Sequence, residues 1–329
     1  MARKLIILLC FLFLVFAERR EIPKIQFEVF ASYLPTNPQH LNLEADYLKQ
    51  KVSFFNDEYF NYLREKGEIS GVNIQQEGDF KKIKGLLMTG ASLHFNLKDR
   101  FSISVGSRFW EGSTKEDFIH FTYDLLKENK KIAEKEIVFS LYELSFEAQN
   151  LFVNFHYLIP FKTKAFQKPL TFELYSGIGY IIAKIRAVWN EAVRYRQSEE
   201  WETYYLKHLK LGTKRSLSFQ AGSRMNLYLG KNFGFYLEGS FFYAKFKGFK
   251  GNGASSYEYN NSNGEYFKKG RSWFEEKWFI TEEEIKTNWG TFRYPYPIND
   301  PSLLPYKTKD FEMKLPPLHF AIGIFLQFI

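Results

Sequence analysis

The sequence predicts an all-β protein, an eight-stranded, antiparallel, up-and-down transmembrane β-barrel with four long external loops. Three observations predict this fold class. Eight segments alternate between large apolar residues and small or polar ones, and the connections between them are alternately short and long. Aromatic residues, which favour strands, make up 19% of the 329 residues although the mean hydropathy is only −0.33. Together these features are typical of a surface-rich β protein.

The N-terminus has the pattern of a secretory signal peptide. Basic Arg3 and Lys4 precede an apolar run over residues 5–16, and Val15-Phe16-Ala17 offers a cleavage site after residue 17. An uncleaved anchor is the alternative, and a lipid anchor on Cys10 is disfavoured because Cys10 lies within the apolar run. Cys10 is the only cysteine, so the mature chain, residues 18–329, would hold no disulfide and no cysteine metal site. No later run is long enough for a membrane helix.

The eight predicted strands share one pattern. In the first, Ile25, Phe27 and Val29 alternate with Gln26 and Glu28, which gives one apolar and one mixed face. The predicted strands cover residues 24–34, 85–95, 101–110, 150–159, 170–185, 216–229, 234–246 and 318–329.

Long connections at about 34–84, 111–145, 186–214 and 247–315 alternate with the short "LKDR", "FKTKAFQKP" and "GKN". In an up-and-down barrel this alternation places every short turn and both termini at one end. Because the mixed face carries the polar residues, we expect it to point inward and the apolar face to contact lipid. A secreted β-sandwich, the alternative, would need turns every 8–12 residues or so.

The segments "LYSGIGYIIAKI" and "FQAGSRMNLYLGKNFGFYLEGSFFYAKF" resemble the small outer-membrane barrels of Gram-negative bacteria, the OmpA/OmpX/OmpW-like class. The terminal "FAIGIFLQFI" resembles that class's assembly signal, here Phe320, Ile322, Ile324, Leu326 and Phe328, although Ile329 follows the final aromatic residue. The resemblance implies a location in the bacterial outer membrane. It also implies contact with membrane lipid and lipopolysaccharide, and recognition by the barrel-assembly machinery. The long loops are unmatched, and members of the class differ in function.

Five charged residues on the mixed faces are candidates for a charge network in the lumen: Glu28, Arg108, Glu173, Arg224 and Glu238. If three residues form the turn after Leu229, Arg224 lies opposite Glu238, with Glu173 on the strand at its other side. Charge-assisted bonds among these groups would plug the barrel. Polar packing without a continuous pore is the favoured interpretation, and a gate with switchable pairs is the alternative.

Metal and catalytic sites are not predicted. His94, His156 and His319 lie on mixed faces, while His40, His120 and His208 lie in loops. His94 and His156 would need a third ligand and closer placement, so we expect hydrogen-bonded lumen histidines, no metal and no cofactor. Ser102 and Ser104 would lie near His94 but inward at the short-turn end, away from any lipid substrate.

The long loops would carry the protein's individual function. Residues 41–68 and 116–136 show apolar residues at mixed helical spacing, and residues 247–315 pass from a flexible segment into an aromatic one. A hairpin around "NNSNGEY" would add two strands. The dispersed net charge of +8 disfavours nucleic acid as a partner. We expect a structural or interaction protein that contacts an extracellular partner through these loops. A narrow channel for small or apolar solutes is the alternative, and a lipid-modifying enzyme ranks third.

Overall fold

The computed structural model describes residues 25–35, 42, 60–98, 100–159, 163–165, 168–281, 285–287, 290–292, 295–298 and 307–328. The predicted signal peptide, Cys10 and His40 lie outside the described residues, as do residues 43–59 of the first predicted loop. Within the described part, no helix is both long and apolar enough to cross a membrane.

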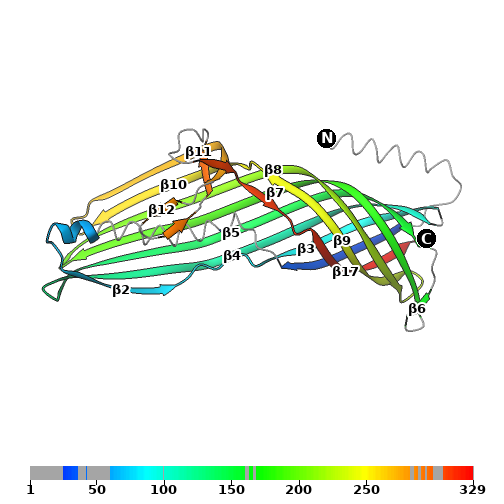
Figure 1. The fold of residues 1–329 in the computed structure, drawn as a ribbon, viewed down its shortest axis with the longest axis horizontal. Coiled ribbons are helices and arrows are strands. Elements are labelled where there is room, and N and C mark those ends of the chain that lie inside the picture. Colours follow the sequence, from blue (N-terminus) through cyan, green and yellow to red (C-terminus); the bar gives the residue numbers. More distant parts are fainter. Residues whose placement is uncertain are drawn as a thin grey trace.

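The protein is all-β and its strands pair antiparallel (Figure 1). Fifteen strands form one sheet, and β12 and β13 form a separate pair. The bounds are β1 Ile25–Pro35, β2 Gly71–Gly78, β3 Gly85–Lys98, β4 Phe101–Lys127, β5 Lys130–Leu158, β6 Thr163–Ala165, β7 Lys168–Gln197, β8 Glu200–Tyr228, β9 Phe233–Lys247, β10 Lys250–Asn261, β11 Tyr266–Thr281, β12 Ile285–Thr287, β13 Gly290–Phe292, β14 Pro295–Ile298, β15 Thr308–Asp310, β16 Glu312–Lys314 and β17 Leu318–Phe328.

Eight strands pair in a cycle. From β1 the pairings run through β3, β4, β5, β7, β8, β9 and β17 and return to β1. Each of these strands covers one of the eight segments that the sequence predicts, with at most one residue of the segment left out. The prediction of eight strands in all is wrong, because seven further strands, fifteen less these eight, extend the same sheet.

Two of the predicted loops are instead long β-hairpins. Strands β4 and β5 continue without interruption across residues 111–145, and β7 and β8 do the same across 186–214. The turn between β4 and β5 consists of Glu128 and Asn129, both at positive φ, as a two-residue hairpin turn requires. The helical spacing expected over 116–136 is therefore wrong, since these residues lie in the paired strands β4 and β5.

The other two predicted loops also contain regular structure. Residues 60–65 form a short helix, and β2 pairs with the outer part of β4. The predicted hairpin around "NNSNGEY" is present as β10 and β11, and β10 pairs with the outer part of β8. These additions lie along the outer parts of the long strands, away from the C-terminal end of β17 (Figure 1).

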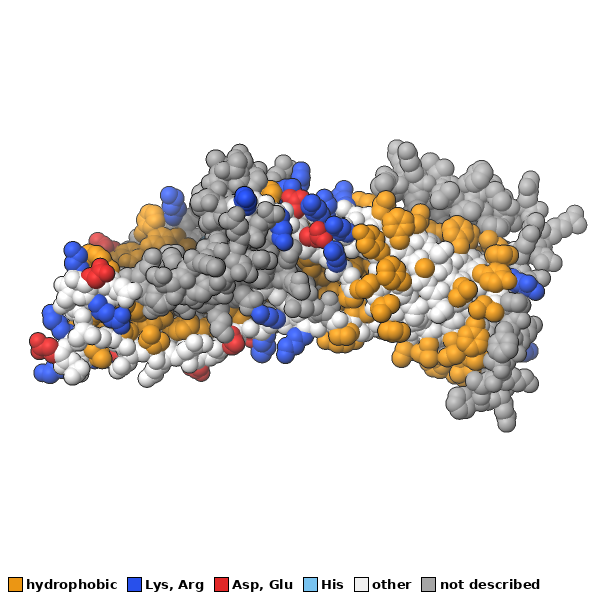
Figure 2. Space-filling model, viewed as in Figure 1, with side chains coloured by type: hydrophobic (Ala, Val, Ile, Leu, Met, Phe, Trp, Pro, Cys, Tyr) orange, Lys and Arg blue, Asp and Glu red, His pale blue; other side chains and the backbone are white. Residues whose placement is uncertain are grey.

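An apolar belt surrounds the cycle of eight strands on its outward face. Leu151, Ile178, Leu217, Phe241 and Phe320 are exposed members of this belt from five different strands. Figure 2 shows the belt as hydrophobic side chains gathered at one end of the molecule, with the charged side chains concentrated over the rest. Inward neighbours of these residues, such as Asn150, Ser218 and His319, are buried, so the alternation seen in the sequence places apolar groups outward and polar groups inward.

The buried interior changes character along the strands. Towards the short turns it holds polar and charged side chains, including Glu28, Asn154 and Arg224. Towards the long hairpins it is apolar, with Trp110 and Phe246 fully buried. Inward glycines make room for large rings, since a Cβ atom at Gly323 would overlap the ring of Tyr236.

Candidate functional site

Arg224 lies at the centre of the buried charges. It sits on β8 directly opposite Glu238 of β9, the register that a three-residue turn predicts. Its guanidinium donates from Nη2 to Glu238 at 2.9 Å and from Nη1 across the interior to Glu28 of β1 at 2.6 Å. The guanidinium also stacks 4.1 Å from the ring centre of Tyr236. One arginine thus links two carboxylates from strands that are not neighbours.

Arg108 provides a second cation for Glu238. Its Nη2 donates to Glu238 Oε1 at 2.9 Å, and the hydroxyl of Tyr175 donates to the same oxygen at 2.6 Å. The guanidinium lies between the rings of Phe30 and Phe152, with its central carbon 5.3 and 4.9 Å from their centres. Glu238 therefore has two arginine partners and a phenol.

Glu28 has Arg224 as its one arginine partner in the described chain. Ser92 donates to its Oε2 at 2.8 Å and Gln26 to its Oε1 at 2.8 Å. His94 Nδ1 lies 3.2 Å from the same Oε1. Glu28 is fully buried, and these four partners come from β1, β3 and β8.

The structure separates Glu173 from the two arginines. Although Glu173 lies opposite Arg224 on β7, the guanidinium turns to Glu28 and Glu238 instead. Glu173 accepts a 2.8 Å bond from Asn226 at Oε1, and its Oε2 lies 3.3 Å from His156 Nδ1. Four of the five predicted charges thus form one network, and Glu173 belongs to a histidine cluster beside it.

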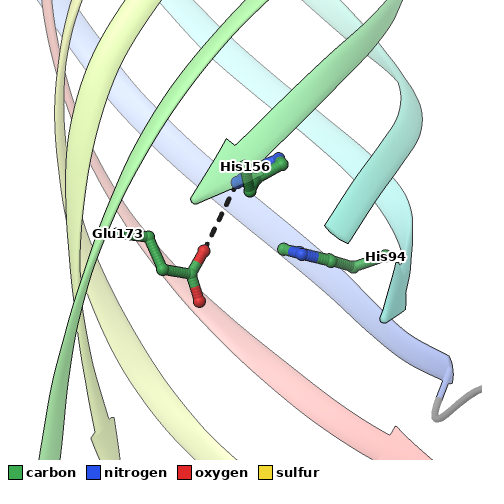
Figure 3. A group of neighbouring side chains, drawn as sticks. All are labelled: His94, His156 and Glu173. Carbon is green, nitrogen blue, oxygen red and sulfur yellow. Dashed lines mark ion pairs between the residues drawn. The ribbon is translucent and has the colours of Figure 1, made fainter. Parts of the chain in front are cut away.

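His94, His156 and Glu173 lie together at the short-turn end of the interior (Figure 3). The ring centres of His94 and His156 are 4.3 Å apart, with β4 between their strands. The sequence predicts that the strands of these two histidines are separated by one neighbour, and this is confirmed; the two rings lie closer together than the sequence indicates. Glu173 is the third member of this cluster. The sequence indicated this only by placing Glu173, like the two histidines, on an inward strand face.

Each histidine also contacts a serine. Ser104 Oγ is 2.8 Å from His156 Nε2, and Ser102 Oγ bonds His94 Nε2. The resulting chains, Ser102–His94–Glu28 and Ser104–His156–Glu173, have the atom order of a nucleophile, a base and an acid. Ser104 is 1% exposed and Ser102 is 9% exposed, so neither hydroxyl has room for a substrate carbonyl.

An apolar layer covers the charged layer on the side of the long hairpins. Trp110 packs 5.1 Å from Phe242, and His319 stacks on Phe242 at 5.0 Å. Farther along, Phe146 meets Phe246 edge to face at 6.4 Å. The third inward histidine, His319, is therefore surrounded by rings, while His120 and His208 lie in the outer sheet.

The predicted assembly residues all lie on the outward face of β17: Phe320, Ile322, Ile324, Leu326 and Phe328. β17 pairs with β9 on one side and with β1 on the other, so it closes the cycle of strands. Their role in assembly remains a prediction.

No protein-family model matches this sequence. A comparison with curated proteins likewise finds no significant match.

Proposed function

We propose that this protein is an integral outer-membrane protein in which the cycle of eight paired strands forms a transmembrane β-barrel. The observation that supports this proposal is the apolar belt on the outward face, combined with charged groups buried inside the same strands. A soluble protein would bury its large apolar side chains and expose its charges. In lipid, strands satisfy every backbone group only when the sheet closes on itself.

The proposed barrel has no open pore. Its charged layer is joined by short bonds from Arg224 to both Glu28 and Glu238. Its apolar layer is filled by packed rings, among them Trp110 and Phe242. An ion would have to break the bonds of the first layer and lose its hydration in the second.

Basic side chains at the edge of the apolar belt nearest the long hairpins support contact with lipopolysaccharide. Lys184, Arg186 and Arg215 stand exposed on β7 and β8, and Lys245 is exposed on β9. They lie where the outward face changes from apolar to charged. Phosphate groups of an outer leaflet would meet these side chains at the level of the headgroups.

The part of the sheet beyond these basic residues, formed by the long hairpins, is the proposed interaction surface. Its inner face is packed, with Ile119, Phe139 and Trp189 buried. On the β10–β11 hairpin, however, Tyr266 is 61% exposed and Phe267 is 52% exposed. Exposed aromatic residues are favoured at protein interfaces. We infer that this hairpin, which pairs with β8 through β10, contacts the extracellular partner.

Three measurements test the proposal. The folded protein should resist SDS at low temperature, change its electrophoretic mobility after boiling, and leave a planar lipid bilayer without stepwise conductance. In intact cells, a photo-crosslinking residue at Tyr266 should capture protein, whereas the same residue at Leu151, within the belt, should capture lipid. A fully water-soluble, protease-sensitive product would contradict the membrane assignment.

A groove in the wall favours the second candidate, a narrow passage for apolar solutes. The pairing of β1 with β17 ends at Ala31 and Ile322, and beyond it Ser32 Oγ donates to the carbonyl of Phe320. A groove of about 760 Å³ at this seam is lined by Tyr33, Leu87, Leu237, Phe320 and Ile322 among others, and it reaches Glu238. Uptake of an apolar solute that is lost in Ala31→Trp, which fills the groove, would favour the passage.

A further inference from the structure

One carboxylate in the barrel interior has no arginine partner within the described chain. The network and the histidine cluster beside it together hold three carboxylates (Glu28, Glu173 and Glu238) and two guanidiniums (Arg108 and Arg224), so the carboxylates outnumber the guanidiniums by one. Both arginines bond Glu28 or Glu238. Within the described chain, the ion pair of Glu173 is with His156 alone. A buried carboxylate is strongly unfavourable without a proton or a cation beside it, and a metal ion would supply that positive charge for Glu173.

The atoms around Glu173 are arranged as metal ligands. One ligand atom from each of His94, His156 and Glu173 lies within 4.8 Å of the others. His156 Nδ1 and Glu173 Oε2 face each other as an ion pair at 3.3 Å, and neither of these buried atoms has a further hydrogen-bond partner. Figure 3 shows both atoms directed into the space beside His94. With Nδ1 deprotonated, an ion bound between these two atoms would accept a lone pair from each.

Each of the three side chains is also held by a second group. Glu28 lies 3.2 Å from His94 Nδ1, Ser104 lies 2.8 Å from His156 Nε2, and Asn226 donates to Glu173 Oε1 at 2.8 Å. Metal ligands in proteins are typically oriented by such outer contacts. The contact of Glu28 with Nδ1 leaves Nε2 of His94 available if the hydroxyl of Ser102 moves aside.

The geometry points to a divalent metal site formed by His94, His156 and Glu173. Two imidazole nitrogens and one carboxylate oxygen suit Zn²⁺ or a similar transition-metal ion better than Mg²⁺ or Ca²⁺. In a tetrahedral zinc site the ligand atoms are roughly 3.4 Å apart, so the widest pair would close by no more than about 1.4 Å. The ion would enter beside Glu173, whose side chain keeps 12% exposure while the two rings keep 3% and 0%.

The test is metal binding by the folded, full-length chain without a histidine tag. We expect one Zn²⁺ per chain in competition with a fluorescent chelator, a visible absorption band when Co²⁺ binds, and no competition from Mg²⁺. His156→Gln and Glu173→Gln should weaken Zn²⁺ at least about 100-fold, and Ser104→Ala, which removes an outer contact, about 10-fold. Heat-dependent mobility in SDS confirms that each variant is folded.

His319→Gln is the matched control, because His319 is an equally buried inward histidine that stacks on Phe242 and lies away from the cluster. Zn²⁺ binding should be unchanged in this variant. Stoichiometric binding that persists in both His156→Gln and Glu173→Gln would assign the ion to another site and overturn the proposal. Absence of both Zn²⁺ binding and the Co²⁺ band in the wild type would overturn it whatever the variants do.

Discussion

Replacing Arg224 by alanine should lower the free energy of unfolding more than any other single substitution in the charged layer. The guanidinium donates at 2.6 Å to Glu28 and at 2.9 Å to Glu238, all three groups being buried. Glu238 would keep Arg108 and Tyr175, whereas Glu28 would keep only the neutral partners Gln26 and Ser92 and the ring of His94. Removal of one partner from a buried pair costs about 3–5 kcal/mol.

The stability lost in Arg224→Ala should thus come mainly from leaving Glu28 without an arginine partner, and a double variant can test this. In Arg224→Met/Glu28→Gln the charge is removed from both partners at similar volume, so most of the lost stability should return. Arg108→Ala should be milder than Arg224→Ala, since Glu238 retains Arg224. The free energy of unfolding would be measured by urea titration in phospholipid vesicles, with tryptophan fluorescence and the heat-dependent mobility shift as two probes.

Two outcomes would refute this account. In the first, Arg224→Ala unfolds at the same urea concentration as the wild type, which would show that the bonds to Glu28 and Glu238 make no net contribution to stability. Alternatively, Arg224→Met/Glu28→Gln could prove less stable than Arg224→Ala, and Glu28 would then not be the source of the loss.

Burial lowers the pKa of Lys135, in the outer part of β5, to about 8 despite nearby Glu191. In the unfolded chain the lysine keeps its proton up to about pH 10.4. The contribution of Lys135 to the free energy of unfolding should therefore be constant below pH 8 and rise from there towards about pH 10.4. This rise should be absent from Lys135→Met when unfolding is measured as a function of pH. The buried hydroxyls of Ser102 and Ser104 should not react with an alkyl fluorophosphonate in the folded protein; mass-detected labelling that disappears in the alanine variants would instead indicate a hydrolase. Gly323→Val should overlap the ring of Tyr236 and slow or prevent assembly, detected as loss of the heat-modifiable band.

The paired strands near the short turns could be predicted from the sequence because alternation there is regular and the turns are short. The turn after Leu229 alone gave the register that sets Arg224 opposite Glu238. The outer hairpins could not be predicted in the same way. The register of β5 against β7 shifts between Leu141 and Glu143, and beyond this point the buried residues of β4 and β5 change from even to odd numbers. The change of phase hides a continuous strand from a search for strict alternation.

The histidine cluster was missed for a different reason. Local pattern placed His94 and His156 inward, but it says nothing about distances across the interior, which depend on how the strands coil around one another. Nor could the pattern show that Arg224 bonds Glu28 and Glu238 rather than Glu173, the residue directly opposite it on β7. Glu173 therefore faces His156, and the proposed metal site depends on this arrangement.

In the proposed barrel the charged layer and the apolar layer would resist permeation for different physical reasons, and this affects how a channel could be recognised. In the charged layer, short bonds to Arg224 and Arg108 hold the carboxylates in place. In the apolar layer, Trp110 and Phe242 leave no polar partner for a hydrated ion. Removing the bonds of one layer leaves the other barrier intact, so an Arg224 variant that fails to conduct does not show that the charged layer is unimportant. Conductance that appears only when both layers are altered would identify two barriers in series.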